Sequence, residues 1–169
     1  LIEIIINDKK AFYNHYQFIT RFLLYINVSL AINQKRHFPF NLYEEMKNDQ
    51  TEEELNNATQ KSLEHIFPQS PRVGDYTDEL INKLSEYTHS VGNLVLVPKG
   101  LNSKLKNESF NRKTEIIFKE MLENDNIKYG LWLHSLMVFG KNNNWEKVDI
   151  EKNAEHVKTT FNSLYSSKF

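Results

Sequence analysis

The sequence contains no cysteine, and its 169 residues include only 5 glycines and 4 prolines. The absence of cysteine excludes disulfides, thiolate zinc sites and a cysteine nucleophile. The scarcity of glycine and proline argues against a disordered linker or a repeat of tight turns. Aromatic residues are plentiful, with 11 Phe, 8 Tyr and 2 Trp. The length and these side chains suit one domain with a sizeable core, or one domain plus an appendage.

The sequence also lacks a long apolar run and the segment order of a signal peptide. Its longest apolar run, from Phe22 to Ile32, is interrupted by Asn27 and Ser29 and is too short to span a bilayer. We therefore expect no membrane span, and the absence of cysteine fits a reducing compartment. Because the first residue is Leu1 rather than Met, we expect the chain to be part of a longer protein.

Charge is nearly balanced but unevenly distributed. The net charge of −1 is unfavourable for a nucleic-acid binder, which must neutralise phosphates. Acids dominate between Glu44 and Glu64. A later basic stretch, from Lys99 to Lys113, contains Glu108 as its single acid. A basic stretch is ordinarily a solvated face, but its position directly after the motifs described below favours contacts with the DNA backbone. The candidates for these contacts are Lys99, Lys104, Lys106, Arg112 and Lys113.

Hydrophobic spacing predicts a largely helical chain. Apolar residues three to four positions apart predict one long helix from Ala11 to about Ile32. Thr51, followed by three glutamates, is typical of the N-cap of a short polar helix that ends near Thr59. Further helices are expected over 78–87, 101–107, 114–123, 131–139 and 149–164.

Two short strands are expected within this helical chain. The first runs from Ser62 to Phe67 and is closed by Pro68. The second, Asn93 to Val97, is apolar and rich in β-branched residues and lies between a glycine and a proline. The order is therefore a strand, a long excursion, a strand and a helix, which predicts an α+β fold that is mostly helical.

Glu64, His65 and Asn102 supply the groups that phosphodiester hydrolysis requires. The reaction needs a base for water and stabilisation of the phosphate and of the leaving oxygen. His65, at the end of the first strand, is the candidate base. A Mg²⁺ ion keeps several waters, so the carboxylate of Glu64 and the amide oxygen of Asn102 can suffice as protein ligands. Adjacent residues of a regular strand point to opposite faces. We therefore expect an irregular strand end, near Pro68, that lets Glu64 and His65 approach one site.

Other polar residues have structural or functional interpretations. Asn93 is expected to hydrogen-bond the backbone of the loop at Glu64 and His65 rather than to touch substrate. Asn102 is either a metal ligand or a helix N-cap. His89 either orients the site by hydrogen bonding or caps the preceding helix. His134 lies in an apolar helix and is expected in the core.

Three short motifs, in order, carry a resemblance to a known family. They are Glu-His-Ile-Phe-Pro-Gln (64–69), Gly-Asn-Leu-Val-Leu (92–96) and Leu-Asn-Ser-Lys (101–104). Together they resemble the HNH, or His-Me finger, nucleases, whose ββα order matches the expected strand, strand and helix. The stretches 89–97, 101–107 and 110–113 more specifically resemble the C-terminal nuclease domain of GmrSD-type modification-dependent restriction proteins.

The resemblance implies a mostly helical α+β fold with an embedded ββα-metal motif. It implies a metal-dependent DNA endonuclease that restricts foreign or modified DNA, with His65 as general base and Asn93 bracing the catalytic loop. Glu64 and Asn102 become ligands of Mg²⁺, for which Mn²⁺ substitutes, and Lys104 becomes a phosphate contact. The implied partners are DNA and an upstream NTPase or DNA-sensing domain, in the cytoplasm of a prokaryote. A double-strand break from one site per chain favours a homodimer.

The resemblance divides the chain into three segments and leaves other functions open. Residues 1–60 would form a helical N-terminal segment that continues from an upstream domain. Residues 61–113 would form the ββα nuclease core, and residues 114–169 would form C-terminal helices that pack on it. The alternatives are an inactive relative that binds nucleic acid or a partner, an RNA nuclease, and a helical interaction module in which the motifs are accidental.

Overall fold

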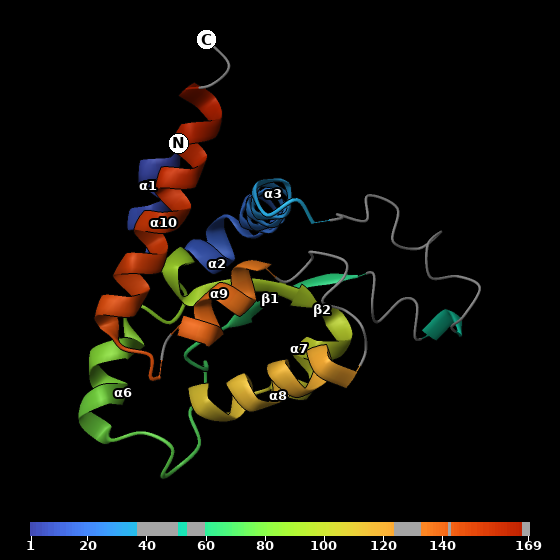
Figure 1. Ribbon diagram of the computed structural model, residues 1–169. Coiled ribbons are helices and arrows are strands. Elements are labelled where there is room, and N and C mark those ends of the chain that lie inside the picture. The colour runs from blue at the N-terminus through green and yellow to red at the C-terminus, as the bar shows by residue number, and fades with distance from the viewer. Residues whose placement is uncertain (37–50, 54–59, 124–132, 142, 167–169) are drawn as a thin grey trace.

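The computed structural model describes residues 1–36, 51–53, 60–123, 133–141 and 143–166 (Figure 1). The expected polar helix after Thr51 lies mostly outside these residues. The described elements are α1 (Ile2–Asn7), α2 (Ala11–Asn14), α3 (Tyr16–Asn33), β1 (Lys61–His65), α6 (Asp78–Ser85), η1 (Val91–Asn93), β2 (Leu94–Pro98), α7 (Lys99–Leu105), α8 (Phe110–Glu123), α9 (Leu133–Lys141) and α10 (Lys147–Ser166). The fold is α+β and mostly helical, as the sequence predicted. None of the helices in these ranges combines the length and the apolar character of a membrane span.

The long helix expected from residue 11 is divided at His15 into α2 and α3. His15 has φ −132° and ψ 22°, outside the helical region. The Asp8 carboxylate holds this break, because it accepts a hydrogen bond from Asn14 Nδ2 at 2.9 Å and lies 3.4 Å from His15 Nε2. The break depends on contacts between polar side chains. Hydrophobic spacing reports only the apolar residues of a helix, so it did not predict the break.

The two strands pair antiparallel, from Lys61 opposite Pro98 to His65 opposite Leu94. Side chains alternate along a strand, so Val95 and Val97 lie on one face and Leu94 and Leu96 on the other. The first face packs in a core cluster with residues of α7 and α8, and the second packs with residues of α1, α3 and α10. The small sheet therefore lies between two helical layers, which Figure 1 shows with α8 on one side and α3 on the other.

A buried polar network joins the helices behind β2. Asn27 Oδ1 of α3 accepts a hydrogen bond from His134 N at 3.0 Å, and His134 Nε2 lies 2.9 Å from Asn153 Oδ1 of α10. Asn153 Nδ2 in turn donates to Gly92 O at 2.9 Å. His134 is a core histidine, as expected, and burial lowers its pKa to about 4, so its imidazole is neutral at pH 7. The network fixes α9 and α10 relative to η1.

Gly92 is required by the close approach of α10. A Cβ atom at this position would lie 2.2 Å from Ile150 O and 3.0 Å from Ala154 Cβ. The first contact is with backbone that belongs to a helix, so it cannot be relieved by turning one side chain. The glycine of the Gly-Asn-Leu motif thus serves packing between η1 and α10.

We expect Gly92→Ala to lower the free energy of unfolding by about 1–3 kcal/mol, because α10 must move away from η1. Denaturation in urea measures this loss. Gly140→Ala is the matched control, since its Cβ would meet only the tip of Phe118 at 3.3 Å. Alanine also suits the helical position of Gly140 better than glycine does. A similar loss in both variants would contradict the packing explanation.

Candidate active site

Glu64 and Lys113 form a buried ion pair on the face of β1 that α8 covers. Lys113 Nζ lies 2.5 Å from Glu64 Oε1, and both side chains are almost completely excluded from solvent. Lys113 Nζ also donates a hydrogen bond to His65 O at 2.5 Å. Lys113 was expected to contact DNA from the surface, and that expectation is wrong. It shares an inward face of α8 with Phe110 and Ile117, which are three and four positions away.

His65 is held by partners on the opposite face of the sheet. Its Nε2 lies 3.1 Å from His89 Nδ1, and Gln69 Nε2 lies 3.0 Å from its Nδ1 and 3.2 Å from its Nε2. The ring of Phe12 packs against it, with centroids 4.6 Å apart. Tyr13 OH lies 3.4 Å from His89 Nε2 and continues the chain of polar contacts towards the surface. Of the two interpretations of His89, its contact with His65 favours the orienting one.

Burial controls the protonation of both adjacent residues. It lowers the pKa of His65 to about 3, and the neighbouring His89 and Lys113 act in the same direction. The imidazole is therefore neutral at pH 7, which is the state that a base requires. Burial raises the pKa of Glu64 to about 7, while Lys113 opposes this change. Even with Lys113 beside it, the carboxyl of Glu64 is therefore harder to ionise than an exposed glutamate.

The expected irregular strand end is not observed at His65. The antiparallel ladder is regular through His65 and Leu94, so the side chains of Glu64 and His65 point to opposite faces. Glu64 contacts Lys113, whereas His65 contacts His89 and Gln69. The link between the two sides runs through Lys113 Nζ, which touches the Glu64 carboxylate and the His65 backbone carbonyl.

Asn93 is fully buried and makes four hydrogen bonds with its side chain. Its Oδ1 accepts from Phe67 N at 2.8 Å and from Trp145 Nε1 at 2.9 Å. Its Nδ2 donates to Phe67 O at 2.9 Å and to Thr88 O at 2.8 Å. These bonds tie the segment that follows His65 to η1 and to the start of α10. They are the contacts that the expected bracing role requires, and the sequence alone did not indicate Trp145 as a partner.

Asn102 lies on the same side of the sheet as Glu64. Its Nδ2 donates to Ser62 Oγ at 2.7 Å, and Ser62 shares a strand face with Glu64, two residues further along β1. The N-cap interpretation of Asn102 is wrong, because α7 begins at Lys99 and its N-cap is Pro98. The carboxylate of Glu64 and the amide oxygen of Asn102 are donors of the kind that a hard divalent ion prefers.

The described residues hold no group of three or more His, Cys, Asp or Glu side chains that could bind a metal. A site of the kind that zinc prefers is therefore absent from this part of the chain. A site built from one carboxylate, one amide oxygen and water is not of that kind, so the donor set of Glu64 and Asn102 still fits Mg²⁺ or Mn²⁺.

Four of the five basic candidates lie on the surface. Lys99, Lys104, Lys106 and Arg112 are exposed. Lys104 pairs with Glu120 and Arg112 with Glu115, each at 2.6 Å. Such exposed pairs are weak and can open for a phosphate. The structure thus keeps a basic surface beside α7 and α8, without Lys113.

One comparison with known proteins identifies the family. The family model of the C-terminal domain of GmrSD restriction endonucleases matches residues 8–158. The chain belongs to this family. The match runs from Asp8, the residue after α1, into α10 and includes the three stretches 64–69, 92–96 and 101–104. No curated protein and no solved structure matches the chain significantly.

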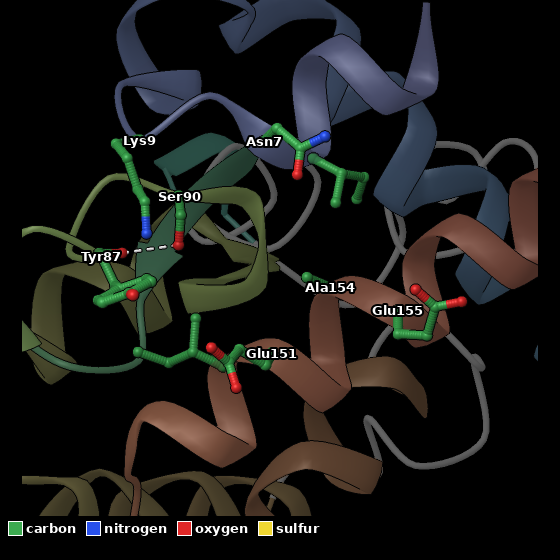
Figure 2. A pocket seen from close by; sticks show the side chains of 9 residues that line it. Asn7, Lys9, Tyr87, Ser90, Glu151, Ala154 and Glu155 are labelled. Carbon is green, nitrogen blue, oxygen red and sulfur yellow. Dashed lines mark hydrogen bonds between the residues drawn. The ribbon is translucent and has the colours of Figure 1, made fainter.

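A cavity of about 230 Å³ in this GmrSD C-terminal domain lies away from the motifs. Figure 2 shows it between Asn7 of α1, Tyr87 and Ser90 of the segment before η1, and Glu151 of α10. At the edge of the cavity, the ammonium of Lys9 lies over the Tyr87 ring, 3.1 Å from the ring centroid. Neither Glu64, His65 nor Asn102 lines this cavity, so the candidate active site is elsewhere, at the end of β1.

Proposed function

We propose that this GmrSD C-terminal domain hydrolyses DNA phosphodiesters with one divalent cation, leaving a 5′ phosphate and a 3′ hydroxyl. The observation that carries the proposal is the neutral, oriented imidazole of His65, adjacent in β1 to the buried Glu64 whose carboxylate lies on the other face of the strand, in a restriction endonuclease family. In this proposal β1, β2 and α7 form the ββα-metal motif. The biological role is restriction of foreign or modified DNA.

His65 is the general base in this proposal. A neutral imidazole takes the proton from the attacking water, and its contacts with His89 and Gln69 set the direction of the ring. Gln69 is exposed, so its amide is the contact that yields to water when substrate binds. His89 stays in place as a positioning residue because Phe12 N donates to its backbone carbonyl at 2.9 Å.

Glu64 and Asn102 would hold the cation, Mg²⁺ or Mn²⁺. When bound, such an ion supplies charge that polarises the phosphoryl oxygen and stabilises the leaving oxygen. Asn93 contributes indirectly by bracing the segment after His65 through Phe67. The exposed side chains of Lys99, Lys104, Lys106 and Arg112 would bind the DNA backbone, and Lys104 would leave Glu120 to do so.

The proposed organisation assigns cutting to this domain and substrate choice to another. Residues 61–113 form the nuclease core, residues 1–60 connect it to an upstream NTPase or DNA-sensing domain, and residues 114–169 pack on it. In the described part of these segments, α3 and α10 cover one face of the sheet and α8 the other. A homodimer would supply the second site for a double-strand break. The proposed location is the cytoplasm of a prokaryote.

Cleavage of supercoiled plasmid DNA tests the proposal. The chain is expected to nick or linearise the plasmid with Mg²⁺ or Mn²⁺, and EDTA should abolish the activity because the cation supplies charge at the phosphate. Glu64→Gln keeps the size of the side chain, removes its charge and should be inactive. Cleavage that EDTA does not reduce would contradict the metal role. RNA cleaved in preference to DNA, or a folded chain that binds DNA without cutting it, would favour one of the alternatives instead.

A further inference from the structure

Lys113 is the one fully buried ammonium among the described residues, with 0% of its surface exposed. A lysine charge is costly to remove from water unless it is paired and hydrogen-bonded. Lys113 is paired with Glu64 Oε1 and donates a hydrogen bond to His65 O, and each oxygen lies 2.5 Å from Nζ. Both oxygens belong to adjacent residues of the candidate active site.

The surroundings of the pair are apolar, so neither charge is solvated in place. Phe110 and Ile117, on the same face of α8 as Lys113, belong to the core cluster that also contains Ile66 and Phe67. The pair is therefore a fixed internal counter-ion arrangement and differs from the exposed pair of Lys104 and Glu120.

We propose that Lys113 is the resident counter-ion of Glu64 and holds its carboxylate in place until a divalent cation takes over that role. Through its bond to the His65 carbonyl, Lys113 also fixes the strand end that carries the base, so it is a positioning residue. The inference rests on the proposed function, because it concerns the same metal ligand.

Two cations that serve one carboxylate compete with each other. If the ammonium of Lys113 neutralises Glu64 in the metal-free protein, its removal leaves a buried, unpaired carboxylate and lowers stability. The same removal frees Glu64 for a divalent ion, so metal affinity should rise by at least about tenfold, given the strength of charge interactions in a poorly solvated site. If Lys113 contributed only packing, its removal would not raise metal affinity, and the loss of stability would not depend on the charge of Glu64.

Thermal unfolding of the metal-free chain tests the first half. Lys113→Met is expected to lower Tm by on the order of 10 °C, whereas the double variant Glu64→Gln/Lys113→Met should recover most of this loss. Lys152→Met, the same substitution at an exposed position of α10, is the control and should change Tm by only about 1–2 °C. Equal losses in Lys113→Met and the double variant would overturn the counter-ion role.

Calorimetric titration with Mn²⁺ tests the exchange. Lys113→Met should bind Mn²⁺ at least about tenfold more tightly than the unaltered chain, and Glu64→Gln should not bind it. If Lys113→Met folds only when Mn²⁺ is present, this rescue also supports the exchange, because Mn²⁺ then replaces the missing ammonium. If it stays unfolded with Mn²⁺ while the double variant folds, the exchange is overturned.

The two proposals fail in different ways. If the unaltered chain binds Mn²⁺ and Lys113→Met binds it with equal or lower affinity, the counter-ion exchange is overturned. The metal site at Glu64 then remains intact. Absence of Mn²⁺ binding in the folded unaltered chain and in folded Lys113→Met overturns both the exchange and the metal-dependent function.

Discussion

His65→Ala is expected to lower the rate of DNA cleavage by about 10²–10⁴-fold, the usual contribution of a general base. The neutral imidazole is the proton acceptor for water, and His89 cannot replace it without moving, because Tyr13 contacts its ring and Phe12 N donates to its backbone carbonyl. The loss should appear in the catalytic rate at saturating Mg²⁺ and DNA rather than in DNA affinity. Initial rates of plasmid nicking measure it.

The fold must survive this substitution for the result to be informative. His65 packs against Phe12, so its truncation should cost on the order of 1–3 kcal/mol of stability, which denaturation in urea monitors. His15→Ala is a matched control, since this histidine contacts Asp8 and none of the motif residues. Cleavage by folded His65→Ala at the rate of the unaltered chain would refute the assignment of the base.

Asn93→Ala is expected to lower the free energy of unfolding by about 4 kcal/mol or more. The substitution removes four side-chain hydrogen bonds and leaves buried groups of Phe67, Thr88 and Trp145 without partners, at about 1 kcal/mol or more each. A loss of this size is a large part of the total stability of a typical domain. Denaturation in urea at several temperatures measures it.

Two further substitutions separate the hydrogen bonds of Asn93 from its size. Asn93→Asp keeps the shape but replaces the amide donor by an acceptor that faces two carbonyl oxygens, so we expect a comparable loss. Asn111→Ala, at an exposed position of α8, should change stability by no more than about 0.5 kcal/mol. Stability of Asn93→Ala within about 1 kcal/mol of the unaltered chain would contradict the bracing role.

Most elements of the fold were predictable from local pattern. Periodicity indicated most of the helices, and the apolar, β-branched stretch before Pro98 indicated β2, because such patterns follow from which face of an element is buried. Boundaries were less predictable. Helix α8 begins at Phe110 rather than at Thr114, and the helix expected from Ala11 breaks at His15. The break depends on polar contacts of Asp8, which hydrophobic spacing does not report.

The candidate site was predictable in its residues but less so in its contacts. The motifs contain Glu64, His65, Asn93 and Asn102, because a base, a carboxylate and amides at short spacing are a chemical pattern in the chain itself. The partners of these residues come from distant segments. Trp145 is 52 positions from Asn93, and nothing in its neighbourhood in the sequence marks it as the donor to Oδ1.

Lys113 shows most clearly what the sequence determined and what the tertiary structure decided. The sequence alone determined that the chain carries a lysine at the end of a basic stretch, three positions from Phe110, and it determined the family through the motifs before it. Only the packing of α8 against β1 decided that this charge is buried beside Glu64, 48 positions from the His65 carbonyl it also binds. Spacing along a helix defines a face, but burial and charge pairing depend on what packs against that face.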